Sequence, residues 1–310
     1  MDVLALVDAA NAAGNVMTRL HNFLIYGNSK EGKTWLMATA IKIKQLKRIY
    51  WFDTENGIET IINMYNQGVL SREELAKVIL IKIPDTRESP IAIETMLKAI
   101  CTKQAVKICE AHGRVGCVEC AKNKAPTIQF DYKSLTNEDA IFIDSLSQVG
   151  TSSLAAATLG KPVTYKPLLD DYGASGKYLS DLLTTIQACA YCHIFAVTHI
   201  LPVTDKNERE TYYPLCGTKQ VSMNCAKYFG NVIFVQKQLK KHRAVSSSLA
   251  NTATIAGSRL GLMLDKMNKP DLSVLLQDQG FFESDSTNEP ADSNTAAQAE
   301  KPKPAFLTRK

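Results

Sequence analysis

The segment Gly27–Thr34 (GNSKEGKT) follows the pattern GxxxxGK[ST] and constrains the fold more than any other part of the chain. Its glycines let the backbone curl so that successive N–H groups face phosphate oxygens, while Lys33 reaches the terminal phosphates and the Thr34 hydroxyl binds Mg²⁺. Such a loop needs a strand before it and a helix after it, and apolar residues 23–26 and 35–38 supply both. We expect the following residues to bind the nucleotide: Gly27, Asn28, Ser29, Lys30, Glu31, Gly32, Lys33, Thr34 and Trp35.

Composition favours a globular α/β protein without a membrane span. The 310 residues are 45% hydrophobic and 22% charged, and no apolar run approaches the roughly 18–20 residues that cross a bilayer. Asp2 and Asp8 stand where a signal peptide carries positive charge, so we expect a cytoplasmic protein with no membrane partner. A net charge of +5 is compatible with nucleic-acid binding but does not establish it.

Residues 48–53 have the aromatic and β-branched content of a buried strand. Together with the loop and helix before it, this strand completes a βαβ unit of a parallel sheet, whose ligands bind at the carboxyl ends of the strands. Glu55 is therefore expected on the same rim as Lys33. Further helices are predicted over 58–65, 72–76 and 89–106, and a further strand over 78–83.

A second acidic motif follows the apolar run 140–143 and ends in Asp144. In this pattern a buried central strand delivers a carboxylate to the Mg²⁺ coordination sphere. The alternative is that Asp144 merely caps a following helix.

Beyond Asp144 we predict a mobile loop over 151–170, a helix over 172–190 and a buried strand over 192–198. His199 ends that strand, either as a sensor of the γ-phosphate or as an ordinary surface residue. The polar segment 201–220 suits a loop that meets single-stranded nucleic acid, with tyrosines for base stacking and basic residues for phosphates. The alternative for this segment is a solvated surface hairpin. Its candidate DNA-binding residues are Lys206, Arg209, Tyr212, Tyr213 and Lys219.

The ends of the chain and its last strands are predicted from composition and periodicity. Strands are expected over 231–235 and 252–255, separated by a basic run at 237–243. Residues 1–20 have the apolar spacing of an amphipathic helix, while residues 283–310 lack apolar periodicity and are predicted to be a disordered tail. Phe306 and Leu307 in that tail are a candidate docking peptide, for instance for a single-strand-binding protein.

Four cysteine and histidine residues fall in the spacing CxxH, four residues, CxxC: Cys109, His112, Cys117 and Cys120. Such a set can close a tetrahedral Cys₃His site, and its thiolate content selects Zn²⁺. All four positions come from protein, so the zinc is expected to be structural, in a knuckle inserted at about 107–124. A redox pair at Cys117 and Cys120 is the alternative.

The motifs GNSKEGKT, WFDTENG, IFIDSL, DDYG (170–173) and IFAVTH occur in an order that resembles phage-encoded RecA-like P-loop ATPases of the AAA type. The similarity covers about 22–264, and some of these proteins anneal single strands or act in recombination. The resemblance implies a RecA-like domain over 21–282, with a mainly parallel central sheet flanked by helices. If the chain is phage-encoded, its place is the host cytoplasm.

The resemblance also implies roles for individual residues. Glu55 matches the glutamate that polarises water, His199 the sensor, and 201–220 the DNA-binding loop. A basic residue from a neighbouring subunit completes many such sites, and Arg259 is the candidate, with Lys240, Lys241 and Arg243 as rivals.

The function implied is an ATP-dependent recombination or single-strand annealing protein that binds single-stranded DNA and hydrolyses ATP as a ring or filament of identical subunits. One alternative is a ring-shaped DNA helicase or translocase of replication. Another is a nucleotide-gated adaptor that does not act on DNA.

Overall fold

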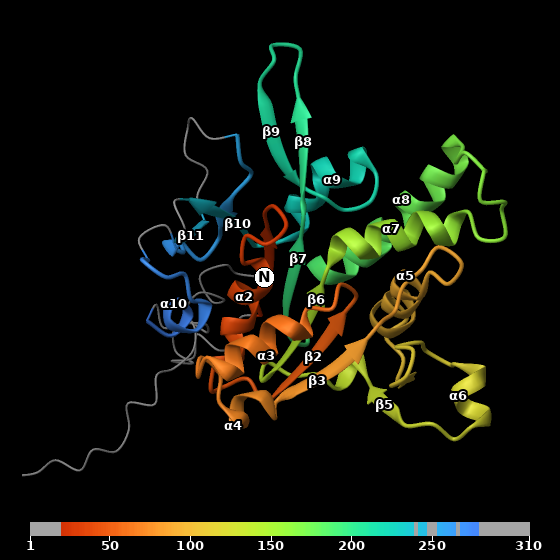
Figure 1. Ribbon diagram of the computed structural model, residues 1–310, viewed down its shortest axis with the longest axis horizontal. Helices are drawn as coiled ribbons and strands as arrows, with labels where there is room; N and C mark the ends of the chain where they lie inside the picture. Colours follow the sequence, from red (N-terminus) through yellow and green to blue (C-terminus); the bar gives the residue numbers. More distant parts are fainter. Residues whose placement is uncertain (1–19, 239–240, 247–252, 265–266, 279–310) are drawn as a thin grey trace, which may run out of the picture.

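The computed structural model describes residues 20–238, 241–246, 253–264 and 267–278 (Figure 1). The expected amino-terminal helix, except for Leu20, and the tail from residue 283 lie outside these ranges. Within them, no helix is both long and apolar enough to cross a membrane.

Eight strands of the described residues form one sheet, in the order β11-β10-β1-β7-β6-β2-β3, with β12 paired to β10. The strands from β10 to β3 are all parallel, whereas β11 and β12 run antiparallel to β10. The α/β fold with a mainly parallel central sheet is therefore confirmed. The strand bounds are β1 Asn22–Tyr26, β2 Arg48–Asp53, β3 Val78–Lys82, β6 Asp139–Asp144, β7 His193–Thr198, β10 Asn231–Gln238, β11 Lys241–Val245 and β12 Gly257–Ser258.

Helices cover both faces of this sheet, because alternate residues of the central strands point to opposite sides and both sets are apolar. In β1, Leu24 and Tyr26 face the layer of α5, α7 and α8, whereas Phe23 and Ile25 face α2, α3 and α10. The helix bounds are α2 Lys33–Thr39, α3 Ile58–Asn66, α4 Arg72–Leu75, α5 Ile91–Met96, α6 Val118–Lys122, α7 Leu146–Ala157, α8 Leu169–Gln187, α9 Lys219–Cys225 and α10 Leu272–Asp278. Shorter 3-10 turns occupy Ala40–Lys42, Tyr132–Ser134 and Ala226–Tyr228, and a π-helical turn occupies Leu97–Cys101.

Two small hairpins extend from this core (Figure 1). One pairs β4, Val106–Cys109, with β5, Thr127–Phe130, and carries α6 between its strands. The other pairs β8, Ile200–Thr204, with β9, Glu210–Pro214, and projects beyond the carboxyl end of β7. The alternative of a surface hairpin within 201–220 is therefore correct as a description of its structure.

The predicted loop over 151–170 is wrong in its first part, because α7 continues to Ala157. The small polar residues there pack two helices closely and do not mark a loop. Ser153 donates to the Gly150 carbonyl oxygen at 2.7 Å, and its hydroxyl lies 2.6 Å from that of Ser175 on α8. Since both serines are buried, their hydrogen bonds are made inside the protein.

Two other predicted elements also need correction. The helix expected over 89–106 ends at Cys101, and Val106 already belongs to β4. The strand expected over 252–255 is reduced, within its described residues, to one bridge between Thr254 and Tyr212. The described residues of the basic run, 237–238 and 241–243, belong to the antiparallel strands β10 and β11.

Replacing Phe195 of β7 by alanine is expected to destabilise the fold by about 3–5 kcal/mol. Phe195 is fully buried, stacks on Phe23 with ring centres 4.6 Å apart, and meets Phe142 edge-on at 5.0 Å. Urea denaturation measures the loss. The control Tyr172→Ala removes a largely exposed ring and is expected to cost less than about 0.5 kcal/mol. Equal losses in the two variants would contradict this packing.

Candidate active site

The glycine-rich loop lies between β1 and α2, as its sequence predicts. Gly32 has φ of +93°, and α2 begins at the next residue, Lys33. At Gly27 a side chain cannot be accommodated, since a Cβ atom would lie 2.2 Å from the carbonyl oxygen of Val235 in β10. The carboxylate of Glu31 accepts from the backbone N–H of Asn28 at 2.8 Å. The loop is thus held by its own residues and by the neighbouring strand.

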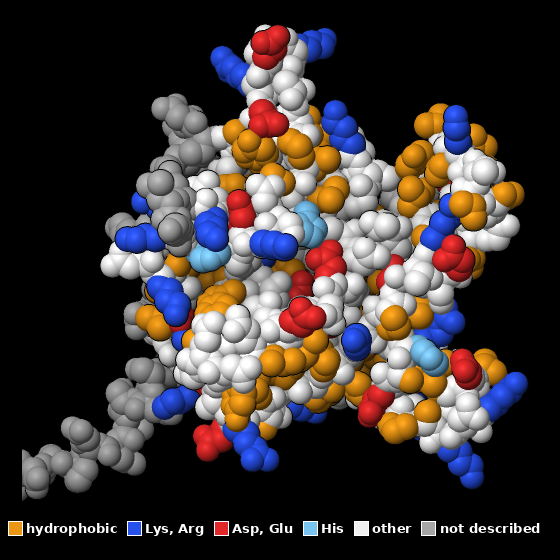
Figure 2. Space-filling model, viewed as in Figure 1, with side chains coloured by type: hydrophobic (Ala, Val, Ile, Leu, Met, Phe, Trp, Pro, Cys, Tyr) orange, Lys and Arg blue, Asp and Glu red, His pale blue; other side chains and the backbone are white. Residues whose placement is uncertain are grey.

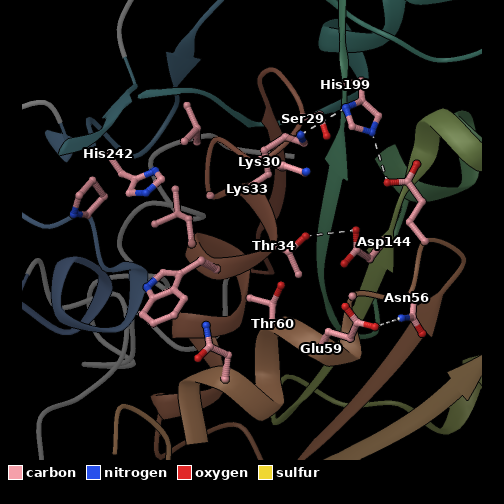
Figure 3. Close-up of a pocket in the computed structure, with 18 of the residues that line it drawn as sticks. Ser29, Lys30, Lys33, Thr34, Asn56, Glu59, Thr60, Asp144, His199 and His242 are labelled. Carbon is pink, nitrogen blue, oxygen red and sulfur yellow. Dashed lines mark hydrogen bonds and ion pairs between the residues drawn. The ribbon is translucent and has the colours of Figure 1, made fainter. Parts of the chain in front are cut away.

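Lys33 points across the loop toward the end of β7 (Figure 3). Its ammonium donates to the Asn28 carbonyl oxygen at 2.7 Å and to Nδ1 of His199 at 3.3 Å. Lys33 is only 6% exposed, and this burial lowers its pKa, although nearby carboxylates, Glu55 first among them, oppose the shift. The ammonium of Lys33 therefore lies where the glycine-rich motif places the terminal phosphates.

Glu55 and His199, predicted separately, lie in contact. The Nε2 atom of His199 is 3.3 Å from one carboxylate oxygen of Glu55, and Ser145 donates to the other oxygen at 2.6 Å. Burial opposes ionisation of Glu55, but the hydrogen bonds from His199 and Ser145 and the charge of Lys33 hold its pKa below the ordinary value. Because Lys33 can only donate and ionised Glu55 can only accept, the arrangement fits a neutral His199 protonated on Nε2.

Asp144 lies at the end of β6 and is 2% exposed. One carboxylate oxygen accepts from the Thr34 hydroxyl at 3.4 Å, but the other, Oδ2, is buried without a hydrogen-bond partner. Burial, with the nearby charges of Asp53 and Glu55, raises the pKa of Asp144 to about 7. The alternative of a helix cap is wrong, because Ser145 is the N-cap of α7 and accepts from the Gln148 N–H.

The chemistry of these residues fits a Mg²⁺ ion. A hydroxyl and a carboxylate are ligand types that Mg²⁺ binds, and a buried carboxylate oxygen without a partner is destabilised until a cation or proton reaches it. Thr34 and Asp144 are the residues that can hold the ion. Gly57 leaves space for this carboxylate, since a Cβ atom there would lie 2.1 Å from Oδ2.

Asp53, which the sequence analysis did not assign to the site, fixes the loop that carries Glu55. Its carboxylate accepts from the backbone N–H groups of Glu55, Gly57 and Ile58 at 3.2, 2.8 and 3.2 Å. The signal was present in the motif WFDTENG, where Asp53 stands at the end of β2.

A cavity of about 620 Å³ extends from the loop to α3 and to residues just before α10 (Figure 3). Trp35, predicted to bind nucleotide, lines it, and the ammonium of Lys269 lies 5.6 Å from the centre of the Trp35 ring. His242 of β11 also lines it and donates through Nδ1–H to the Glu31 carbonyl oxygen at 2.8 Å. Lys269 and His242 were missed, since no local pattern indicates residues brought in from more than 200 positions away.

Arg259 is not part of its own chain's site. It follows β12 beside the amino end of β10, whereas the site lies at the carboxyl ends of the strands, and its backbone N–H donates to the Gly230 carbonyl oxygen at 3.0 Å. Lys241 and Arg243 are exposed on β11, and Lys240 lies outside the described residues. None of these basic residues lines the 620 Å³ cavity within the described part of the chain.

The predicted DNA-binding residues are divided between the tip and base of the β8–β9 hairpin and a separate helix. Lys206 and Arg209 are exposed near the tip, where basic and acidic side chains lie together (Figure 2). The ring of Tyr212 lies parallel to that of Phe234, with centres 6.4 Å apart, so one of its faces is turned to the core. Tyr213 is half-buried on β9, and Lys219 is exposed at the start of α9.

The Cys/His cluster comes together at one end of the β4–β5 hairpin. The ligand atoms of Cys109, His112, Cys117 and Cys120 all lie within 4.8 Å of one another. Nδ1 of His112 is 3.6 Å from Sγ of Cys117 and 3.4 Å from Sγ of Cys120, separations that suit tetrahedral Zn²⁺ ligands. The cluster can therefore hold a metal ion.

The knuckle containing this cluster packs against the core through its central turn. Gly113 has φ of +60°, and a Cβ atom there would lie 2.5 Å from the Lys82 carbonyl oxygen of β3. The Gly113 carbonyl oxygen accepts from the Thr95 hydroxyl at 2.8 Å. The turn at Gly113 thus joins the knuckle to the end of β3 and to α5.

Asp144 gives the metal-free protein a specific pH dependence. Its pKa is raised from 3.8 to about 7 on folding, so its contribution to stability is complete below pH 4 and is lost as pH rises through 7. Without metal, the unfolding free energy should fall from pH 5 to pH 8 by about 1–3 kcal/mol more in the wild type than in Asp144→Asn. Urea denaturation in a chelator measures both proteins; an identical pH dependence would exclude this burial of charge.

Sequence and structure comparisons place this site in context. A family model described as AAA domain matches residues 21–260, whereas no curated protein matches the chain. Among solved structures, a prototypical ATPase from the type III secretion system of pathogenic bacteria has 15% identity and a TM-score of 0.39, over 71% of this chain and 53% of that one. This chain thus spans about half the length of that ATPase.

Two further solved structures have similarly low sequence identities and TM-scores. The RadB recombinase has 13% identity and a TM-score of 0.37, over 73% of this chain and 79% of that one. The ATPase EscN from enteropathogenic E. coli, assembled with its central stalk EscO, has 11% identity and a TM-score of 0.40, over 71% and 43%. The family match covers most of the 310 residues, including the loop, Glu55, Asp144 and His199. The chain belongs to the AAA domain family and is a P-loop ATPase.

Proposed function

We propose that this ATPase is a DNA recombination or single-strand annealing protein that binds single-stranded DNA and hydrolyses ATP as a homo-oligomer. The observation that carries the proposal is the position of His199. Its ring bridges Lys33 and Glu55, and the next residue, Ile200, begins β8 of the projecting hairpin. A change at the phosphates therefore has a short covalent route to the hairpin.

Within the site, each residue has a distinct role in hydrolysis. Lys33 exchanges its contacts with Asn28 and His199 for phosphate oxygens and neutralises their charge. Glu55, kept ionised by its neighbours, accepts a hydrogen bond from the attacking water and orients it. Mg²⁺ held by Thr34 and Asp144 supplies further charge neutralisation on the phosphates.

His199 acts as the sensor in this scheme. It contacts Lys33 through Nδ1 and Glu55 through Nε2. Departure of Lys33 toward phosphate leaves Nδ1 without this donor. The backbone N–H of His199 donates to the Ser147 hydroxyl at 2.8 Å, so the backbone at the start of the hairpin is also connected to α7.

The hairpin is the proposed DNA contact. Its exposed Lys206 and Arg209 face solvent near the tip, where they can meet phosphates, although Asp205 and Glu208 partly offset their charge. Tyr213 and Lys219 lie nearer the hairpin's base and extend the surface toward α9. Tyr212 offers at most one ring face, because the other is turned to Phe234.

Assembly is proposed because the site lacks a charged group that many phosphate-transfer sites use. No arginine of the described residues lines the cavity; its basic side chains there are Lys30, Lys33, Lys269, His199 and His242. A basic residue of a neighbouring subunit, with Arg259 as the first candidate, completes the site. Arg259 lies at the amino end of β10, away from the cavity of its own chain, which is why a neighbouring subunit's site is proposed for it.

The knuckle is proposed to hold a structural zinc ion. Cys109, His112, Cys117 and Cys120 fill all four positions of a tetrahedral ion, which leaves none for a substrate. With an ion bound, these four residues would hold the turn at Gly113, which packs against β3.

Two substitutions separate binding from chemistry. Lys33→Ala is expected to abolish ATP turnover because the phosphate charge is no longer neutralised. Glu55→Gln is expected to bind ATP as the wild type does, while kcat falls by roughly 10²–10⁴-fold because the water is no longer oriented. Phosphate release and nucleotide titration measure the two effects. Normal turnover by Glu55→Gln would remove the role assigned to Glu55.

Single-stranded DNA is expected to stimulate ATP hydrolysis and to bind less tightly when the tip is neutralised. Lys206→Ala with Arg209→Ala should lower affinity and flatten its dependence on salt by about two phosphate contacts. Arg72→Ala with Lys177→Ala removes the same charge from exposed sites on α4 and α8 and serves as control. If both double variants bind DNA equally, the hairpin is not the contact.

The same assay, with a mass measurement of the assembly, distinguishes the other functions. Unwinding of duplex DNA coupled to hydrolysis would favour the helicase. ATP hydrolysis that is indifferent to single-stranded DNA would favour the nucleotide-gated adaptor.

Purified protein is expected to contain about one zinc ion per chain, because the cluster offers one tetrahedral site. Cys117→Ser with Cys120→Ser should release it and lower the melting temperature. Elemental analysis checks the content. Cys189→Ser with Cys192→Ser removes two cysteines outside the cluster and should retain the zinc; a wild type free of zinc would contradict the assignment.

A further inference from the structure

A second pair of cysteines lies in the turn between α8 and β7. Cys189-Ala-Tyr-Cys192 has the CxxC spacing, and the two sulfur atoms are 3.9 Å apart. No disulfide bond joins the two cysteines in the structure.

The two thiols differ in access. Both cysteines line a small cavity of about 140 Å³, but Cys189 is half-buried whereas Cys192 is only 1% exposed. Because Cys189 is the more exposed of the two, a reagent from solution is expected to meet it first, with the Cys192 sulfur 3.9 Å away. This is the arrangement of an attacking and a resolving thiol.

The surroundings favour a thiolate at the accessible position. The thiol of Cys192 stabilises the Cys189 sulfur by hydrogen bonding and lowers the pKa of Cys189 to about 6. The hydrogen bond and burial raise the pKa of Cys192 well above its ordinary value. Arg259, which lines the same cavity, adds a positive charge to this side of the molecule.

We propose that Cys189 and Cys192 are a reversible dithiol–disulfide pair that exchanges with small-molecule disulfides of the glutathione class, with Cys189 as the attacking thiol. The sulfur atoms need to approach from 3.9 Å to the roughly 2.0 Å of a disulfide bond, a movement within the reach of a turn. A metal site is not an equivalent explanation, since within the described residues the pair belongs to no group of three or more metal-ligating side chains.

The exchange balances in two steps. The thiolate of Cys189 attacks one sulfur of glutathione disulfide, forms a mixed disulfide and releases one glutathione thiolate, which takes up a proton. Cys192 loses its proton and attacks Cys189 sulfur, which forms the protein disulfide and releases the second glutathione. Counted from the dithiol, the protein loses two electrons and two protons, and glutathione disulfide gains them to become two thiols.

The full-length, zinc-loaded protein is incubated with glutathione disulfide under native conditions, and each cysteine is then assigned by peptide mass spectrometry. The wild type is expected to lose two hydrogens, located at Cys189 and Cys192, without retaining glutathione. Excess reduced glutathione should reverse the change. Cys192→Ala is expected to retain about one glutathione per chain at Cys189, and Cys189→Ser to retain none at Cys192.

The buried pair Cys216 and Cys225 provides an internal control, since both are fully buried and should remain reduced throughout. Folding of each variant is verified by its melting curve, and Cys189→Ser replaces a half-buried side chain of similar size. A wild type that stays reduced, or one that retains glutathione without closing the disulfide, would overturn the proposal. Oxidation of Cys216 and Cys225 at the same rate would also overturn it.

Discussion

The site depends on the parallel register of four neighbouring strands. Tyr26 of β1 pairs with Thr198 of β7, and Asp144 of β6 pairs with both Val197 and Asp53. The four strands consequently end at one level, and the residues that follow them meet there. The glycine-rich loop, His199, Ser145 and Glu55 come from four separate parts of the sequence, yet they line one rim because of this register.

Three carboxylates lie close together at this rim, and the protein treats each differently. Asp53 is satisfied by three backbone N–H groups, and Glu55 by the side chains of His199 and Ser145. Asp144 alone keeps a buried oxygen without a partner. Since an unpaired buried charge is destabilising, the Asp144 carboxylate fits the Mg²⁺ expected with ATP. An ion held by Asp144 and Thr34 would lie beside the phosphates, where negative charge develops during hydrolysis.

Residues next to a local motif could be predicted from sequence, because strand ends and glycine spacing are local. Lys33, Glu55, Asp144 and His199 converge as expected, and β2 has the predicted bounds 48–53. His242 and Lys269 could not be predicted, since only the tertiary fold brings them to the cavity. The α7 error had another cause: buried serines with internal hydrogen bonds have the same composition as a loop. The stacking of Tyr212 on Phe234 could not be predicted either, because the two residues are far apart in the sequence and no local pattern connects them.

The most direct measurement is a crystal structure with Mg²⁺ and a non-hydrolysable ATP analogue. The account predicts that Lys33 leaves the Asn28 carbonyl and His199 for phosphate oxygens, and that Thr34 and Asp144 meet the metal while Glu55 stays beside the terminal phosphate. A nucleotide bound away from Gly27–Thr34, or one bound there with Lys33 still on Asn28 and Asp144 without a cation, would contradict the account.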